Sequence, residues 1–141
     1  MGEKRTVVIE QLCEKRFAAH NESDRTVIVD GASPAVSLRP MELLLAALGG
    51  CTAYDVVDIM KKKRTPLARY RVEVTGERAE KHPRRYTHIH VVHVGAGEGV
   101  TEKQFAQAVR LSHEKFCSAS ANLNAEITWE VRLEDAADAG A

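Results

Sequence analysis

The fold is decided by the stretch Pro40-Met-Glu-Leu-Leu-Leu-Ala-Ala-Leu-Gly-Gly-Cys-Thr-Ala-Tyr-Asp-Val-Val-Asp-Ile-Met-Lys-Lys-Lys-Arg64. Pro40 suits a first helical turn, Glu42 favours the positive end of the helix dipole, and the cations at 61–64 favour the negative end. No charge interrupts the run from Leu43 to Ala53. A helix that is apolar on every side is typical of one enclosed by other elements. The stretch therefore predicts a core helix that carries Cys51.

A membrane span is the alternative for an apolar segment of this kind. The uncharged part is well short of the roughly 18 to 20 residues that cross a bilayer. Asp55 and Asp58 interrupt the sequence that follows it. We therefore expect a core helix and no membrane partner.

Length and charge exclude other classes of protein. A chain of 141 residues has the size of one ordinary domain, so we expect a single domain over 1–141. Twenty basic and twenty acidic side chains give no net charge, which disfavours binding to nucleic acid. The polar start, Met1 to Arg5, leads directly into a β-rich stretch without an apolar signal segment, so we expect a cytoplasmic protein.

The rest of the chain alternates strand patterns with one further helix. Tyr70, Val72 and Val74 share one face of a half-buried strand, and Thr101 with Gln104 matches a capping box. The acidic residues 134–141 have no apolar face and predict a frayed tail. The expected elements are strands at 6–12, 16–20 and 25–30, a helix at 40–64, strands at 68–78 and 86–95, a helix from 101 to about 116, a turn or short helix at 117–122, and a strand at 125–133.

This order predicts an α+β fold that a single copy of the chain cannot complete. Six strands and one other helix cannot easily surround a long helix that is apolar all round. A second copy supplies the missing cover in obligate homodimers, whose interfaces resemble a protein core cut in half. We therefore expect a homodimer.

Three widely spaced cysteines, Cys13, Cys51 and Cys117, fit neither a disulfide scaffold nor a zinc knuckle. If the glycines before Cys51 bend the helix, its thiol lies near a new helical start, whose unpaired N–H groups favour a thiolate. Asp55, one turn later, opposes a negative sulfur, and an inert core cysteine is the alternative. Cys117, at an expected helix end, could resolve an oxidised Cys51 as a disulfide. The sequence alone does not show that the two meet.

Two motifs together resemble the osmotically inducible protein C and organic hydroperoxide resistance superfamily. They are Pro40 to Thr52 and the later His-Glu-Lys-Phe-Cys-Ser-Ala-Ser-Ala of 113–121. The resemblance implies antiparallel sheets wrapped around long central helices in an intertwined homodimer. It also implies two interfacial sites that reduce organic hydroperoxides in oxidative stress defence, recycled by a dithiol such as a lipoylated protein. On this pattern Cys51 is the reactive cysteine and Cys117 the resolving one, with no cofactor.

The sequence departs from the superfamily pattern at two positions. Peroxidase members carry a catalytic Glu directly after the motif proline, where this chain has Met41, with Glu42 one place later. Glu42 is about 13 Å along the axis from Cys51, so it would serve the partner's cysteine or simply favour its own helix N-terminus. Arg16 is the nearest candidate for the arginine that holds the thiolate, with a solvent-facing cation as the alternative. With these departures, the chain resembles the branch called YhfA-like more than the established peroxidases.

Two sets of histidines have spacings that could bind a metal. His88 and His90 share a strand face, and His113 lies one helical turn before Cys117. No third ligand is evident at either place, so we expect no metal, a solvated strand face and a surface or supporting role for His113.

The leading hypothesis is a thiol peroxidase in which Cys51 becomes a sulfenic acid that Cys117 resolves. Apolar residues from Leu43 to Leu48 favour bulky organic peroxides as substrates. The alternative is a non-enzymatic protein that binds a small apolar or electrophilic molecule in the dimer groove, because a shared fold does not guarantee shared chemistry.

Overall fold

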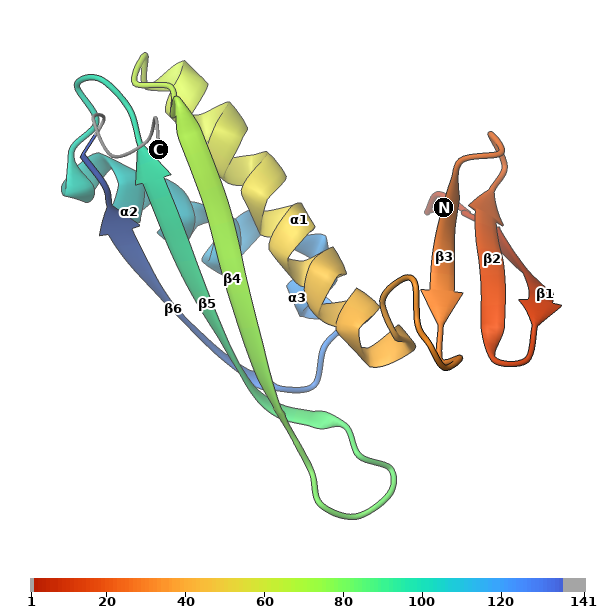
Figure 1. The fold of residues 1–141 in the computed structure, drawn as a ribbon. Helices are drawn as coiled ribbons and strands as arrows, with labels where there is room; N and C mark the ends of the chain where they lie inside the picture. Colours follow the sequence, from red (N-terminus) through yellow and green to blue (C-terminus); the bar gives the residue numbers. More distant parts are fainter. Residues whose placement is uncertain (1, 136–141) are drawn as a thin grey trace. The chain divides into compact units, whose positions relative to one another are not determined.

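The computed structural model describes residues 2–135, which divide into two compact units, one extending to Leu44 and the other beginning at Leu45 (Figure 1). The expectation of a single domain over 1–141 stays a prediction. The elements are β1 (Val7–Cys13), β2 (Arg16–Asn21), β3 (Thr26–Asp30), α1 (Pro40–Lys62), β4 (Arg69–Arg78), β5 (Tyr86–Ala96), α2 (Glu102–Leu111), the π-helical turn η1 (Ser112–Phe116), α3 (Ser118–Ala121) and β6 (Glu126–Leu133).

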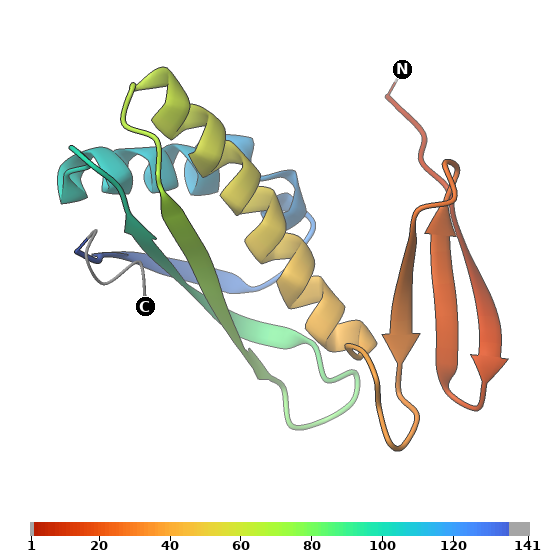
Figure 2. The same cartoon turned by 45° about the horizontal axis from the view of Figure 1, so that its top comes forward.

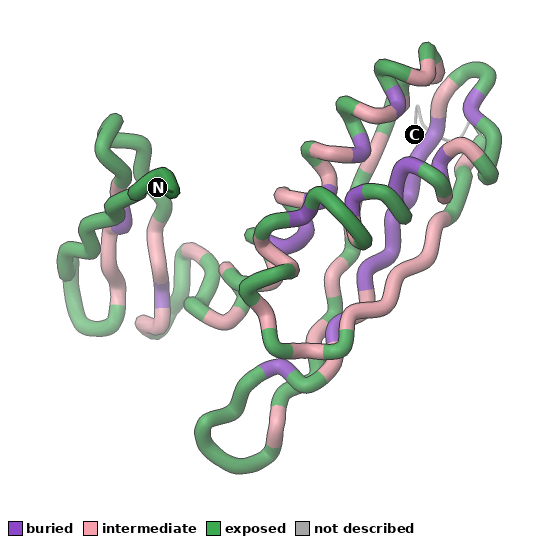
Figure 3. Tube along the Cα trace, turned by 180° about the vertical axis from the view of Figure 1, so that it is seen from behind, coloured by how far each residue is buried: buried purple, intermediate pink, exposed green. Residues whose placement is uncertain are grey.

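The first unit contains the antiparallel meander that the sequence predicts, with the strand order β1-β2-β3. Ile9 pairs with Ala19, and Ala19 in turn pairs with Val27. Every residue of β1 is exposed, including apolar residues that point to opposite faces of the sheet, such as Val8 and Ile9. Strand β1 therefore leaves its apolar side chains exposed, whereas β2 and β3 are partly buried (Figure 3).

The second unit is a three-stranded sheet with helices on one side (Figure 2). β4 pairs with β5 in antiparallel register, and β5 pairs with β6 in parallel register, with Val91 opposite Trp129. The parallel pair requires a crossover connection, which α2, η1 and α3 provide. The α+β class that the sequence predicts is confirmed, with one parallel pair added.

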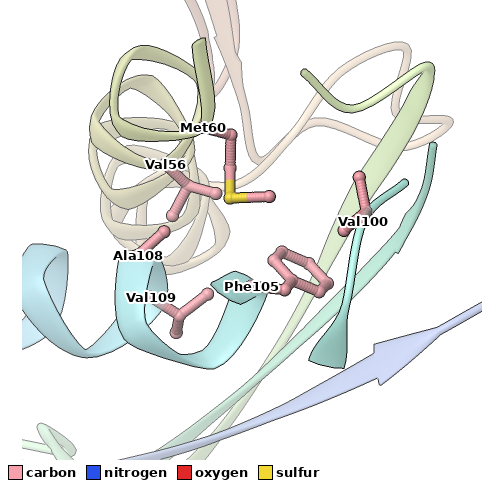
Figure 4. Close-up of a cluster of buried hydrophobic side chains, with 6 residues drawn as sticks. All are labelled: Val56, Met60, Val100, Phe105, Ala108 and Val109. Atoms are coloured by element: carbon pink, nitrogen blue, oxygen red, sulfur yellow. The ribbon is translucent and has the colours of Figure 1, made fainter. Parts of the chain in front are cut away.

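The core of the second unit forms where α1 and α2 meet (Figure 4). Both predicted capping-box bonds are present at the start of α2, between Thr101 and Gln104. They satisfy two backbone N–H groups that the first turn of a helix leaves unpaired. The buried cluster consists of Val56, Met60, Val100, Phe105, Ala108 and Val109.

Helix α1 is covered on only part of its circumference. Leu48, Thr52, Val56 and Met60, spaced four residues apart, are fully buried. Apolar side chains elsewhere on the helix stay exposed, with Tyr54 at 79%. The sequence predicts a helix that is enclosed on all sides, but within one chain only one side of α1 is buried.

Helix α1 is also the one helix, within residues 2–135, that is long and apolar enough to cross a membrane. Length and composition alone do not separate a membrane span from a core helix. Leu48, Val56 and Met60 are fully buried within the protein, and this packing favours the core helix.

Two predictions near the C-terminus need correction. The second helix does not continue regularly to Phe116, because α2 ends at Leu111 and a π-helical turn follows. Glu134 was expected in a frayed tail, yet its backbone N–H donates to Gly95 O at 2.7 Å. Residues 136–141 of the predicted tail lie outside the described residues.

Candidate active site

The two cysteines of the proposed pair meet in the second unit. Cys51 lies partly buried in the middle of α1, and Cys117 is buried directly after η1. The Cys51 side chain interacts with the Cys117 thiol, although 66 positions (117 minus 51) separate them in the sequence. Both are free thiols, so the structure presents the pair in its reduced form.

The environment of Cys117 keeps it protonated. Burial raises the pKa of the Cys117 thiol, and Cys51 acts in the same direction, while hydrogen bonding with Ser120 acts against both. Ser120 also donates through its hydroxyl to the Cys117 carbonyl at 2.9 Å. A buried thiol of this kind does not compete for an oxidant as a thiolate does, which suits a resolving cysteine.

Helix α1 approaches the sheet closely at one glycine, two residues before Cys51. A Cβ on Gly49 would come within 2.9 Å of Val74 Cγ2 in β4, whereas nothing lies within 4 Å of a Cβ on Gly50. The helix runs unbroken through both glycines. Cys51 therefore does not lie at the start of a new helical stretch, and a locally positive helix end does not act on its sulfur.

A buried polar link, formed by Thr52, Asp55 and Ser112, joins α1 to η1. The Thr52 and Ser112 hydroxyl oxygens are 2.7 Å apart, and Ser112 donates to Asp55 Oδ2 at 2.8 Å. Thr52 and Ser112 are fully buried. The backbone N–H of Cys117 donates to Ser112 O at 2.8 Å, which closes the π-helical turn. Through Ser112, these bonds connect Thr52, the residue after Cys51, to the backbone of Cys117.

A chain of hydrogen bonds runs from Tyr70 through two histidines. Burial raises the pKa of the Tyr70 hydroxyl, and the charge of Asp55 acts in the same direction. The Tyr70 hydroxyl therefore keeps its proton, and its oxygen lies 2.6 Å from His93 Nδ1. The Nε2 atoms of His93 and His113 are 2.9 Å apart, so one of the two rings donates to the other.

His113 lies at the end of this chain, where its Nε2 is also 3.4 Å from Thr52 Oγ1. Its Nδ1 is buried and has no hydrogen-bond partner among the described residues. The ring stacks on Trp129 with centroids 5.9 Å apart. Burial lowers the pKa of His113 to about 4, against an opposing effect of Asp55. Burial, together with His113, lowers the pKa of His93 to about 3.

An open pocket of about 550 Å³ lies beside Cys117. Its wall is part apolar, from Ile127 and Trp129 of β6, and part polar, from η1. Such a pocket can hold an apolar group next to the thiol. The lining residues are His113, Glu114, Lys115, Cys117, Ser120, Ala121, Ala125, Ile127 and Trp129.

The remaining predicted site residues belong to the first unit. Arg16 Nε donates to the fully buried Asp30 at 3.0 Å, and Arg16 Nη2 donates to Pro34 O at 2.8 Å. Arg16 Nη1 lies 3.8 Å from Cys13 Sγ. Backbone N–H donors at Val36 and Ala32 and the Arg16 cation keep the pKa of Asp30 below its usual value, against burial. Arg16 is therefore held in one orientation and is not a free solvent-facing cation.

Glu42 acts within its own helix terminus. Its Oε1 accepts from the backbone N–H of Arg39 at 2.8 Å. This contact matches the second of the two interpretations of Glu42, a group that favours the helix N-terminus. A role of Glu42 or Arg16 toward a cysteine stays a prediction.

The strand histidines form a separate polar cluster. His90 lies between Thr128, at 2.7 Å, and Glu130, at 3.0 Å, and His88 also reaches Thr128. Hydrogen bonding with His90 lowers the pKa of Glu130, against a raising effect of burial. Within residues 2–135, no group of three or more His, Cys, Asp or Glu side chains is arranged to hold a metal ion.

Sequence reasoning missed most of the polar residues that surround the cysteines. It placed Tyr70 on an apolar face and gave His113 a surface or supporting role, and it did not single out His93. Two signals were available. Thr52 interrupts a buried stripe of residues spaced four apart, and His93 lies between valines in a buried strand.

Comparison with known proteins supports one assignment. A family model described as OsmC-like protein matches residues 32–132. The protein YhfA of Escherichia coli K12 is 38% identical over 104 residues, which cover 74% of this chain and 78% of YhfA. A hypothetical protein from Aquifex aeolicus VF5, of known crystal structure, is 36% identical with a TM-score of 0.78, covering 94% of this chain and 99% of that chain.

A more distant structure has a related fold. The organic hydroperoxide resistance protein OhrB of Bacillus subtilis aligns with a TM-score of 0.62 at 13% identity, over 92% of this chain and 98% of that chain. At this level of identity the likeness concerns the fold alone.

Proposed function

The chain belongs to the OsmC-like protein family, and from this premise we propose that it is a homodimeric thiol peroxidase that reduces organic hydroperoxides. The observation that supports the proposal is the interaction of Cys51 with the thiol of Cys117, which lines an open pocket. Neither an isolated reactive thiol nor an inert core cysteine requires a second thiol at this place.

The reaction has three balanced steps. The Cys51 thiolate attacks the distal peroxide oxygen, the O–O bond breaks, and the alkoxide takes a proton and leaves as an alcohol. The Cys117 thiol then attacks the Cys51 sulfenic acid, forming a disulfide and releasing water. A dithiol reductant exchanges with this disulfide, becomes a disulfide itself and returns both protein thiols. No metal or other cofactor takes part.

The pocket supports organic rather than inorganic peroxides as substrates. Ile127, Trp129 and Ala121 line it with apolar surface, which can hold the organic group of a peroxide. Hydrogen peroxide gains nothing from such a wall. In the proposed dimer, Glu42 acts on the partner's cysteine. Arg16, which Asp30 holds in one orientation, is the arginine that holds the thiolate.

The deciding experiment measures consumption of cumene hydroperoxide with dihydrolipoamide as reductant. Wild type is expected to turn the peroxide over, and Cys51→Ser is expected to lose this activity completely. Without the reductant, Cys117→Ser should consume one peroxide per site and stop at the Cys51 sulfenic acid, whereas wild type goes on to the disulfide. Wild type that consumes no peroxide, while both thiols react with a chromogenic disulfide, would rule out the peroxidase.

A non-enzymatic ligand-binding protein is the second candidate. Met41 stands where superfamily peroxidases carry the catalytic Glu, and the Glu42 carboxylate is engaged by the Arg39 backbone. In that case the pocket beside Cys117 binds an apolar or electrophilic molecule without turnover. Loss of free thiol that matches ligand added, with no alcohol product, would identify it.

A further inference from the structure

Ser112 is hydrogen-bonded to both segments that carry the cysteines. Its side chain meets Thr52, the residue after Cys51, with 2.7 Å between the hydroxyl oxygens. Its main-chain carbonyl accepts from the backbone N–H of Cys117 at 2.8 Å. Ser112 is fully buried, so water does not compete for either contact.

The donors in this link are fixed by proton counting. A serine hydroxyl has one proton, and a carboxylate only accepts. Ser112 donates to Asp55 Oδ2 at 2.8 Å, so its oxygen accepts from the Thr52 hydroxyl in the shortest bond that Thr52 makes. The other contacts of the two hydroxyls, from Thr52 to His113 Nε2 and from Ser112 to Thr52 O, are longer, at 3.4 Å each. Removal of either hydroxyl therefore takes the shortest hydrogen bond from the other.

The turn that ends at Cys117 needs such support. A π-helical turn is rare, is often found at functional sites, and closes through i→i−5 bonds in place of the usual i→i−4 bonds. Here the Cys117 N–H reaches back five residues to Ser112. If the turn relaxed to α-helical register, Cys117 would rotate by about 100°, the angle between successive residues of an α-helix. The thiol would then turn away from its present neighbour.

We propose that the hydrogen bond between Thr52 and Ser112 positions Cys117 against Cys51, so that the disulfide of the proposed peroxidase closes rapidly. Thr52 and Ser112 are positioning residues, because the hydrogen bonds of their side chains go to each other, to Asp55, to His113 and to the backbone. The inference rests on the proposed function for its biological meaning, but the geometric claim can be tested without peroxide.

Glutathione provides that test. The Cys51 thiolate attacks glutathione disulfide and releases one glutathione, and Cys117 then attacks the mixed disulfide and releases the second. The rate of this second step, divided by the rate at which free glutathione attacks the same mixed disulfide, gives the effective concentration of the Cys117 thiol toward it. Misplacement of reacting groups by about 1 Å can cost on the order of a hundredfold, so this quantity is sensitive to the position of Cys117.

Four variants separate the hydrogen bond from packing. Thr52→Val keeps the shape but lacks the hydroxyl, and Thr52→Ser keeps the hydroxyl. Ser112→Ala removes the other partner, and Ser118→Ala is a control at an exposed serine of the same region. We expect the effective concentration to fall about tenfold or more in Thr52→Val and Ser112→Ala. Thr52→Ser and Ser118→Ala should stay within about twofold of wild type.

The outcomes are distinguishable from those of the peroxidase test. If wild type forms the disulfide with glutathione, the variants show the expected order, and no peroxide is consumed, the positioning role stands and the peroxidase fails. If folded Thr52→Val matches wild type, or Thr52→Ser falls equally far, the positioning role is wrong. It is also wrong if wild type forms no Cys51–Cys117 disulfide. Circular dichroism verifies folding, and if Ser112→Ala does not fold, the two Thr52 variants decide.

Discussion

At the scale of single residues, burial of two histidines predicts how stability depends on pH. His93 and His113 have a pKa of about 3 and about 4 in the folded protein, against an ordinary value near 6.5. Between these values the unfolded chain binds more protons than the folded one, so stability is complete above pH 6.5 and is lost as the pH falls. Each histidine contributes a slope of up to about 1.4 kcal/mol per pH unit.

Urea denaturation between pH 7.5 and 4.5 measures this slope. His93→Gln keeps an acceptor for Tyr70 and a donor for His113 but does not titrate, so its stability should fall less steeply than that of wild type. His82→Gln, in an exposed loop, should retain the wild-type slope. Identical slopes for all three proteins would show that His93 is not held neutral by burial.

The same scale shows where sequence reasoning stops. The identity of the two cysteines followed from short motifs, because those residues lie in recognisable local sequence. The chain from Tyr70 through His93 to His113 joins β4, β5 and η1, and its members are separated by 23 and 20 positions. No local pattern predicts contacts of that kind.

At the scale of elements, the close approach of α1 to β4 at Gly49 can be tested. A Cβ there would lie 2.9 Å from Val74 Cγ2, and a β-branched neighbour has little freedom to move away. Gly49→Ala and Gly50→Ala gain the same helix propensity. We therefore expect Gly49→Ala to be less stable than Gly50→Ala by about 1–3 kcal/mol, the usual cost of overpacking.

Chemical denaturation of the two variants at equal protein concentration gives this difference. Equal stabilities would contradict the close packing of α1 on the sheet. Gly50 lies on the exposed side of the helix. A loss of stability in Gly50→Ala that grows on dilution would therefore indicate an interface between chains.

The sequence predicted the helices and strands, but not the π-helical turn or the parallel strand pair. Periodicity and capping residues located α1, α2 and all six strands, because hydrophobic pattern and end signals are local properties. The π-helical turn at Ser112–Phe116 was not predicted, since the extra residue is stabilised by tertiary bonds to Thr52 and Asp55. The parallel pairing of β5 with β6 likewise depends on the crossover and not on either strand.

At the scale of the whole molecule, exposed apolar surface predicts a second copy of the chain. Tyr54 and Val57 on α1 are 79% and 40% exposed, and the whole of β1 is exposed. Homodimers bury such surface in large apolar interfaces. Sedimentation should therefore give a mass near twice 15.6 kDa.

A charge on the exposed face of α1 should break this dimer. In a two-fold interface each substitution occurs twice, so Val57→Lys would bury two cations near one another, without partners. Leu111→Lys is the matched control, because Leu111 is also 40% exposed and a cation suits the end of α2. We expect the dissociation constant to rise at least a hundredfold in Val57→Lys, about 3 kcal/mol, and to stay unchanged in Leu111→Lys. A wild-type protein that sediments as a monomer would refute the dimer, and with it any role of Glu42 at a partner's cysteine.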